Sequence, residues 1–217
     1  TRRGARAIGP VKAGGGSPAV AKRIALVPYG SGDLRAMRAA TGETLWANPL
    51  DRGRPGSALA FIGDVSGDPV INGNVAYAST QAGQTAQFNM SNGNLNWTLP
   101  AGSNSPVWTV GTSVFMVTEQ SRLLRLNALN GDVVWSVQLP EFEKPKKKDN
   151  YIPHYGPIVA QGLVWVAGSD GQLRGFAPQS GTQVYSVEIP DGAAAAPAVA
   201  GGRMYIISRD GQLHAFQ

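Results

Sequence analysis

Short apolar and alternating runs follow one another along this chain, and turn residues separate them. The clearest example begins with two apolar runs at 156–159 and 163–167, the second rich in strand-forming residues. The dipeptide Asp170-Gly171 then marks a hairpin, because it accepts the positive φ angles of a tight turn. Residues 172–176 alternate polar with apolar, and a further strand-like run follows at 183–187. The pattern predicts a unit of four short antiparallel strands.

The same unit recurs along the whole chain with nearly constant internal spacing. A proline opens each unit, a turn residue follows 14 residues later (15 in the third unit), and an aromatic residue follows after 14 more. The prolines are Pro18, Pro69, Pro106, Pro157 and Pro197, the turn residues are Gly32, Gly83, Ser121, Gly171 and Gly211, and the aromatic residues are Trp46, Trp97, Trp135 and Tyr185. A glycine (Gly42, Gly93, Gly131, Gly181) stands four residues before each aromatic residue. Such repetition predicts one supersecondary unit whose copies bury each other's faces.

Four short strands in each repeat predict an all-β protein, a β-propeller of four-stranded antiparallel blades. A sandwich or a barrel also has many short strands, but not this constant spacing. We expect one incomplete propeller domain over residues 1–217, with four complete blades and a three-stranded fifth. The expected blades are 17–50, 68–100, 105–140, 156–190 and 196–217. The aromatic residues Trp46, Trp97, Trp135 and Tyr185 are expected to dock neighbouring blades, rather than to grip a ligand.

Composition supports turn-rich β-structure. The chain has 28 Gly and 15 Pro, yet 42% of its residues are hydrophobic and lie in strand-length runs. It has no cysteine, which excludes disulfides and thiolate metal sites. No apolar run approaches the ~20 residues of a membrane span. The opening residues 1–3 carry no signal-peptide pattern, so we expect a fragment or a processed chain.

The positive charge is partly clustered. The net charge is +5, and lysines at 144 and 146–148 and arginines at 2, 3 and 6 form two groups. The plain interpretation is solvated loops; the alternative is attraction to an acidic partner or an anionic membrane surface. Nucleic acid is not expected as a partner, because exposed aromatic residues do not alternate with these charges.

The sequence offers little for catalysis. His154 lies in an insertion before the fourth unit, and His214 occupies a strand position taken by Arg35, Arg125 or Arg174 elsewhere, which we interpret as facing solvent. Neither histidine shows a metal-binding spacing, and no Gly-x-Ser-x-Gly motif is present. The aspartates beside the turns are interpreted as turn formers. We therefore expect no catalytic, metal or cofactor-binding residue and no enzyme.

Two segments resemble the repeat of the pyrroloquinoline-quinone (PQQ)-type propellers. Residues 39–46 read AATGETLW and residues 128–135 read ALNGDVVW, whereas residues 90–93 and 178–181 lack the Ala and Tyr185 replaces the Trp. One subgroup with this repeat comprises quinoprotein dehydrogenases, many with adjacent cysteines and acidic Ca²⁺ ligands, which this chain lacks. A degenerate PQQ-dependent quinoprotein dehydrogenase is therefore the alternative interpretation, together with a general periplasmic protein- or ligand-binding propeller.

The chain is more similar to the BamB-type outer-membrane assembly lipoproteins, from about Ser17 to its end. Residues 63–70 (GDVSGDPV) resemble the start of a blade in that family, residues 138–140 precede a Lys-containing insertion, and residues 210–217 (DGQLHAFQ) resemble the end of those proteins. The resemblance implies the C-terminal portion of an eight-bladed ring.

That resemblance also implies a function. It implies a non-enzymatic scaffold without cofactors at the periplasmic face of the outer membrane, which binds the POTRA domains of the barrel-inserting subunit. The membrane would be reached only through an N-terminal lipid anchor. The implied contact corresponds to a connector near residues 58–68, where we expect Leu59, Phe61, Ile62 and Asp64 to bind protein, or the apolar ones to pack under the propeller rim.

An open array of blades leaves two uncovered faces. We expect exposed apolar surface near Val20, Ile24 and Leu26 at one end. At the other end we expect it near Tyr205, Ile207 and Phe216, together with the free edge of strand 212–216. Uncovered edges recruit other chains, so the fragment is expected to self-associate. The alternative is a closed five-bladed ring with residues 6–11 as the missing strand.

Overall fold

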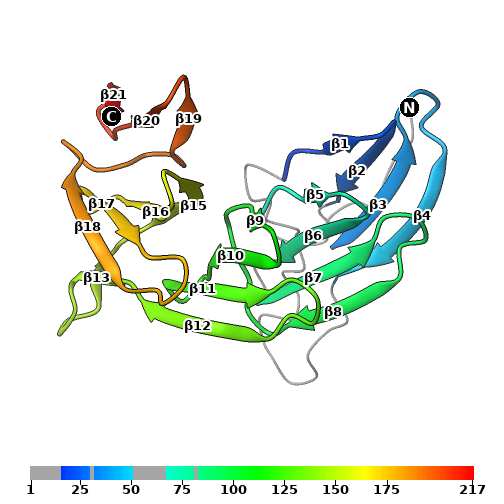
Figure 1. Cartoon of the computed structure of the whole chain (residues 1–217), viewed down its shortest axis with the longest axis horizontal. Coiled ribbons are helices and arrows are strands. Elements are labelled where there is room, and N and C mark those ends of the chain that lie inside the picture. The colour runs from blue at the N-terminus through cyan, green and yellow to red at the C-terminus, as the bar shows by residue number, and fades with distance from the viewer. Residues whose placement is uncertain (1–15, 30–31, 51–66, 81–82) are drawn as a thin grey trace. The chain divides into compact units, whose positions relative to one another are not determined.

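The structure of the 217-residue chain is a computed structural model that describes residues 16–29, 32–50, 67–80 and 83–217 (Figure 1). Every regular element in these ranges is a β-strand. Among the described residues no helix is long and apolar enough to cross a membrane. The chain divides into two compact units, the first made of residues 1–107 with 129–131 and the second of residues 108–128 with 132–217.

The first unit contains two four-stranded antiparallel sheets with the strands in chain order (Figure 1). The first sheet comprises β1 (Ala19–Ala21), β2 (Ile24–Pro28), β3 (Asp33–Arg38) and β4 (Thr44–Pro49). The second sheet comprises β5 (Val70–Asn72), β6 (Val75–Thr80), β7 (Gln84–Asn89) and β8 (Leu95–Leu99).

The second unit contains two more sheets of four strands, a sheet of three strands and a separate hairpin, each in chain order. The third sheet comprises β9 (Trp108–Val110), β10 (Ser113–Val117), β11 (Arg122–Asn127) and β12 (Val133–Gln138). The hairpin comprises β13 (Phe142–Lys144) and β14 (Asp149–Tyr151). The fourth sheet comprises β15 (His154–Ala160), β16 (Leu163–Gly168), β17 (Gln172–Phe176) and β18 (Gln183–Glu188), and the fifth comprises β19 (Ala198–Ala200), β20 (Arg203–Ile207) and β21 (Leu213–Phe216).

These sheets are the blades predicted from the repeat, four complete and a fifth of three strands. Two differences stand out. The insertion 141–154 contains the hairpin β13–β14, and His154, predicted from the sequence to lie in this insertion, is the first residue of β15. Strand pairing explains each difference. Phe142 pairs with Tyr151 across the hairpin, and His154 pairs with Gly168 in the fourth sheet.

Apolar residues pack between consecutive blades rather than at one centre. Leu34, Trp46 and Phe88 belong to the core between the first and second sheets, and Val117, Val166 and Phe176 to the core between the third and fourth. Inner strands are therefore covered on both faces. In β17 all four residues from Leu173 to Phe176 are buried, although the alternation of polar and apolar residues at 172–176 is typical of a half-buried strand, so that interpretation is wrong.

The prediction of exposed apolar surface at the two ends of the array is also only partly correct. Val20 is 66% exposed, but Leu26 is fully buried because it belongs to the core shared with the second sheet. In the fifth blade, Ile207 and Leu213 are exposed, whereas Tyr205 and Phe216 are half-buried.

A β-bulge recurs at one place in every complete blade. The pairing of the third with the fourth strand shifts register between Ala36 and Met37, and at the corresponding positions in the second, third and fourth sheets. In the first sheet Ala36 pairs with Trp46 and Met37 with Thr44, so the residue immediately before the aromatic one is unpaired. A bulge increases the local twist and changes the direction of side chains, so the constant spacing before the aromatic residue sets the direction in which that residue points.

Candidate functional site

The connector expected to bind protein joins the first two blades. Leu59, Phe61, Ile62 and Asp64 all belong to the segment 51–66, which lies outside the described residues. What the structure does describe are the two flanks of this segment, which both lie in the first unit.

Both flanks are held by hydrogen bonds or close packing. On the first side, the amide of Leu50 donates to the carbonyl of Gly32 at 2.8 Å, and the Leu50 side chain is buried in the core. On the other side, the amide of Ser17 donates to the Asp68 carboxylate at 2.6 Å. A Cβ added to Gly67 would lie 3.0 Å from the carbonyl oxygen of Ser105. The connector therefore starts and ends on fixed points of its own unit.

The repeated aromatic residues meet the glycine turn of the following blade. The indole Nε1–H of Trp46 donates to the carbonyl of Met90 at 2.8 Å, and the Trp46 ring stacks on Phe88 with centroids 6.2 Å apart. A Cβ at Gly93 would lie 2.6 Å from Cδ2 of Trp46, so only glycine fits against this ring. The bulge before Trp46 places the indole on this neighbour.

The same contact recurs along the chain. A Cβ at Gly131 would lie 2.7 Å from Cδ2 of Trp97, and Trp97 is buried. The Nε1–H of Trp135 donates to the carbonyl of Pro178 at 2.9 Å, and a Cβ at Gly181 would lie 2.9 Å from the Trp135 ring. Each glycine also has a positive φ, which most L-residues avoid.

Tyr185 differs from the other three aromatic residues. Like Trp97 and Trp135, it contacts an aromatic residue of its own sheet (Trp165, with ring centroids 6.2 Å apart), but it is 58% exposed. Close by, between the fourth and fifth sheets, lies an open cavity of about 410 Å³. Its apolar lining includes Trp165, Val187, Val199 and Phe216.

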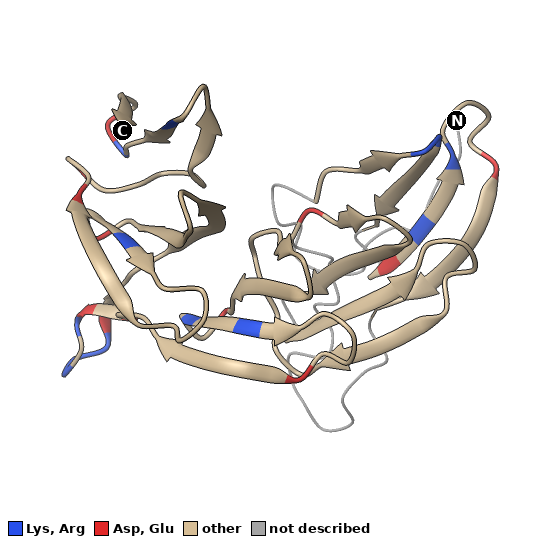
Figure 2. Ribbon diagram, viewed as in Figure 1, with Lys and Arg blue, Asp and Glu red and all other residues tan. Residues whose placement is uncertain are grey.

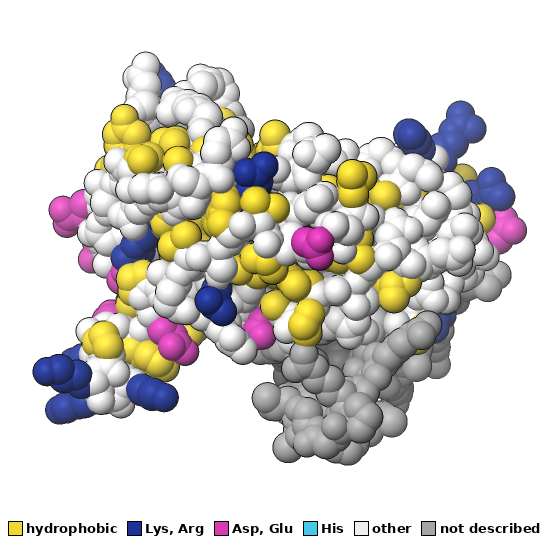
Figure 3. Space-filling view, turned by 60° about the horizontal axis from the view of Figure 1, so that its bottom comes forward, with side chains coloured by type: hydrophobic (Ala, Val, Ile, Leu, Met, Phe, Trp, Pro, Cys, Tyr) yellow, Lys and Arg dark blue, Asp and Glu magenta, His cyan; other side chains and the backbone are white. Residues whose placement is uncertain are grey.

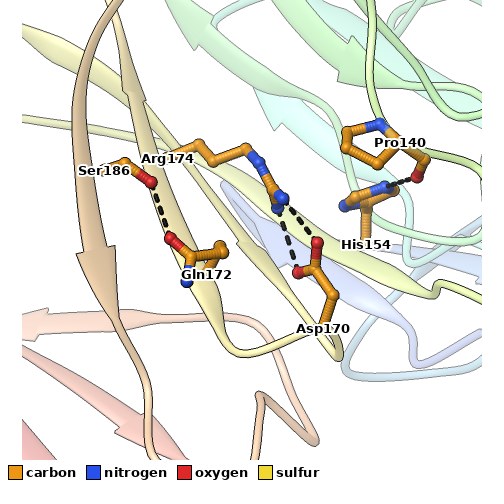
Figure 4. A network of polar contacts seen from close by, with 6 residues as sticks. All are labelled: Pro140, His154, Asp170, Gln172, Arg174 and Ser186. Atoms are coloured by element: carbon orange, nitrogen blue, oxygen red, sulfur yellow. Dashed lines mark hydrogen bonds and ion pairs between the residues drawn. The ribbon is translucent and has the colours of Figure 1, made fainter. Parts of the chain in front are cut away.

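Polar residues on the third strands are bound to partners and do not simply face solvent. Arg174 is buried, and its guanidinium forms a two-pronged ion pair with Asp170, with Nη1 and Oδ1 3.1 Å apart (Figure 4). Arg35 pairs with Asp33 at 3.4 Å and lies 4.7 Å from the ring centre of Tyr29. The solvent-facing interpretation of these positions is therefore wrong. Two of the turn aspartates, Asp33 and Asp170, therefore do more than form turns, because each pairs with an arginine of a third strand.

His154 lies beside this ion pair (Figure 4). Its Nε2–H donates to the carbonyl of Pro140 at 2.7 Å, whereas Nδ1 is buried and has no hydrogen-bond partner. Burial lowers the pKa of His154 below its ordinary value of 6.5; the Pro140 hydrogen bond opposes this shift and the Arg174 charge adds to it. Neutral His154 thus ties the end of the third blade to the start of the fourth.

The remaining histidine does not complete a catalytic triad. Its Nε2 lies 2.9 Å from Oγ of Ser208, and Asp210 also contacts that hydroxyl, which lowers the pKa of Asp210. In a Ser-His-Asp triad the carboxylate orients the imidazole, but here it contacts the serine. In the part of the chain that the structure describes, no group of three or more His, Cys, Asp or Glu residues is arranged to hold a metal ion.

Four-stranded blades in which a repeated Trp contacts the glycine turn of the next blade define the class: this is a β-propeller with PQQ-like repeats. The family described as outer membrane protein assembly factor BamB matches residues 5–137 and 145–217. The chain belongs to this family. Because the family is one of assembly factors, this finding agrees with the expectation that the chain is not an enzyme.

Individual relatives carry the same description. The chain is 25% identical over 201 residues to BamB of Legionella pneumophila, covering 91% of this chain and 49% of the relative. It is 27% identical over 211 residues to BamB of Alkalilimnicola ehrlichii, covering 94% and 51%. The crystal structure of BamB from Moraxella catarrhalis superposes with a TM-score of 0.80 at 20% identity, covering 94% of this chain and 59% of that structure. The chain thus spans about half the length of the curated relatives it matches.

Proposed function

We propose that this chain is part of a non-enzymatic scaffold for the assembly of outer-membrane proteins, located at the periplasmic face of the outer membrane. The observation that carries the proposal is the family match, which extends over residues 5–137 and 145–217. An accessory factor of this kind acts through surfaces and needs no reacting group.

We propose further that the connector between the first two blades binds the POTRA domains of the barrel-inserting subunit, with Leu59, Phe61, Ile62 and Asp64 as contacts. The fixed flanks at Leu50 and Asp68 support this idea, because a connector with fixed ends loses less conformational entropy when it binds. Apolar residues buried at an interface contribute about 1–3 kcal/mol each.

Calorimetry with isolated POTRA domains tests this proposal. Phe61→Asp is expected to abolish binding and to leave the melting temperature nearly unchanged. The matched control is Leu129→Asp, because Leu129 is an exposed apolar residue in a turn far along the sequence. Loss of folding in Phe61→Asp would instead favour packing of the connector under the blades. Full binding by a folded Phe61→Asp protein would exclude Phe61 as a contact.

A second candidate, a ligand-binding propeller, draws on the apolar cavity between the fourth and fifth sheets. Titration with PQQ and Ca²⁺, followed by absorbance and calorimetry, distinguishes the scaffold from a quinoprotein. We expect no stoichiometric binding, since the described residues offer no carboxylate cluster for the cation. A stoichiometric micromolar site would contradict the scaffold proposal.

A further inference from the structure

The hairpin β13–β14 is a well-defined projection between the third and fourth blades. Phe142 pairs with Tyr151 and Lys144 with Asp149 across its two strands. Its tip is a compact turn, in which the amide of Lys147 donates to the carbonyl of Lys144 at 3.0 Å and that of Lys148 to Pro145 at 3.3 Å. Lys148 has a φ of 50°, in the left-handed region.

The base of the hairpin is fixed to the third blade. The rings of Phe142 and Tyr151 meet edge to face at 6.0 Å, and the Tyr151 hydroxyl lies 3.3 Å from Oγ of Ser121, which is fully buried. The amide of Ile152 donates to the backbone carbonyl of Glu141 at 2.9 Å, and the Ile152 side chain is buried. Together with the bond from His154 to Pro140, these contacts hold the hairpin in a defined direction.

Positive and negative charges are separated along this hairpin. Lys146, Lys147 and Lys148 are all exposed at the tip, where Figure 2 shows the ribbon in blue and Figure 3 shows blue side chains gathered. Of the hairpin lysines that the structure describes, Lys144 is the one in an ion pair, with Asp149 at 3.8 Å. Glu143 lies toward the base and accepts a hydrogen bond from Asn150. Three ammonium groups without an ion pair in the described structure are therefore held at the tip, and the acidic residues Glu141, Glu143 and Asp149 lie on or next to the two strands below it.

We propose that this lysine tip contacts the anionic phospholipid headgroups of a membrane surface. Each Lys close to such a surface strengthens binding about fivefold, and the attraction requires no shaped pocket. The tip is convex, which suits a flat, charged surface.

The composition of the tip favours a lipid surface over an acidic protein. Protein interfaces are anchored by Trp, Tyr and Arg in desolvated pockets, whereas the tip contains only lysines and Pro145. Lysine is a compact, strongly hydrated charge, in contrast to the planar fork with which arginine binds a fixed carboxylate. This contact goes beyond the POTRA-binding proposal and does not depend on it. It develops one of the alternatives that the sequence left open for the clustered lysines, attraction to an anionic membrane surface.

The test uses this chain and vesicles of phosphatidylcholine with or without one third phosphatidylglycerol, sedimented at millimolar accessible lipid. The triple variant Lys146→Gln, Lys147→Gln, Lys148→Gln is compared with the control Lys22→Gln, Arg23→Gln, Arg209→Gln. The control removes the same charge from residues that are also exposed, and Lys22 and Arg23 also have positive φ. Thermal melts establish that both variants are folded.

The unmodified chain is expected to prefer the phosphatidylglycerol vesicles, and this preference is expected to disappear in high salt. The tip variant is expected to lose about 100-fold in apparent partition and the control less than about threefold. Three outcomes would overturn the proposal. They are no preference of the unmodified chain for the anionic vesicles, equal losses in both variants, and a tip variant that binds vesicles fully. A tip variant with full vesicle binding but lost POTRA binding would assign the lysines to a protein partner.

Discussion

The second unit contains two interfaces between consecutive blades, here called seams, and they differ in how fully the aromatic residue of the repeat is covered by the next blade. Between the third and fourth blades, Trp135 donates to the carbonyl of Pro178 and the Gly181 turn lies on its ring. Between the fourth and fifth blades, the corresponding Tyr185 is 58% exposed and a cavity of about 410 Å³ is open beside it. Among the described residues the fifth sheet has three strands, so these residues offer Tyr185 no turn between a third and a fourth strand.

The difference shows how a seam is completed. Apolar packing alone does not close it, because Met204 and Ile206 are buried in the open seam just as Val164 and Val166 are buried in the closed one. What distinguishes the closed seam is the glycine turn, which covers the aromatic ring and accepts its N–H. The docking role of the four aromatic residues remains a prediction that substitutions can test.

The largest effect is expected at the open seam, as self-association of the 217-residue chain. β21 is the last strand of its sheet, and Ile207 and Leu213 are exposed on it and its neighbour. Such an edge pairs with another chain, so light scattering should give a mass above that of the monomer that rises with concentration.

Ile207→Lys with Leu213→Lys should restore the monomer, and Val134→Lys, at an exposed position in the outer strand of the third blade, should not. A folded monomer at every micromolar concentration would contradict the open seam. It would favour the alternative closure through residues 6–11, which lie outside the described residues.

Removing the aromatic ring of the repeat should lower the free energy of unfolding much more at the closed seam than at the open one. Trp135→Ala deletes a half-buried indole with its hydrogen bond, so we expect a loss of about 2–3 kcal/mol in the free energy of unfolding. Tyr185→Ala should lose less than about 1 kcal/mol, because the side chain is mostly exposed. Urea denaturation of both variants measures the difference. Equal losses would show that burial against the next blade is not what the aromatic position contributes.

Replacing glycine by alanine should distinguish a steric clash with the aromatic ring from the cost of a positive φ. Gly181 and Gly42 occupy the same place in the repeat and have φ of +74° and +70°. A Cβ at Gly181 meets Trp135 at 2.9 Å, whereas a Cβ at Gly42 meets nothing within 4 Å. Gly42→Ala should therefore cost about 1 kcal/mol from the backbone alone, and Gly181→Ala about 2 kcal/mol. Indistinguishable melting temperatures would mean that the ring moves aside freely.

The smallest effect is expected from pH at His154. Burial holds its pKa below the ordinary 6.5, so the unfolded chain binds more protons in that range than the folded chain. This stability contribution is present above about pH 6.5 and is lost as the pH falls from 6.5 through the lower folded pKa. His154→Gln should flatten the decline of the urea midpoint between neutral and mildly acidic pH. An unchanged slope would show that the histidine becomes charged without cost.

Much of the blade architecture could be predicted, because turns and aromatic spacing are local signals. The fourth unit was predicted with strands at 163–167 and 172–176, and the structure has β16 at Leu163–Gly168 and β17 at Gln172–Phe176. The ion pair of Asp170 and Arg174 was missed, because periodicity says which residues alternate but not what covers each face. The hairpin β13–β14 was missed because its tip is lysine-rich and only Phe142 and Tyr151 mark its strands. The candidate binding connector stays a prediction, since its residues lie outside the described ranges.

The repeated bulge affects which mutations the protein can tolerate, because substitutions and deletions at the bulged residue act differently. The residue that carries the bulge, Val134 in the third blade, has no partner in the ladder, yet its presence sets the side of the sheet on which Trp135 emerges. Because Val134 is 52% exposed, its replacement is expected to alter little, but deleting its codon would turn the aromatic ring away from the neighbouring glycine. Sequences of this kind are therefore expected to tolerate wide divergence in residue identity and to reject single-codon insertions or deletions between the glycine and the aromatic residue.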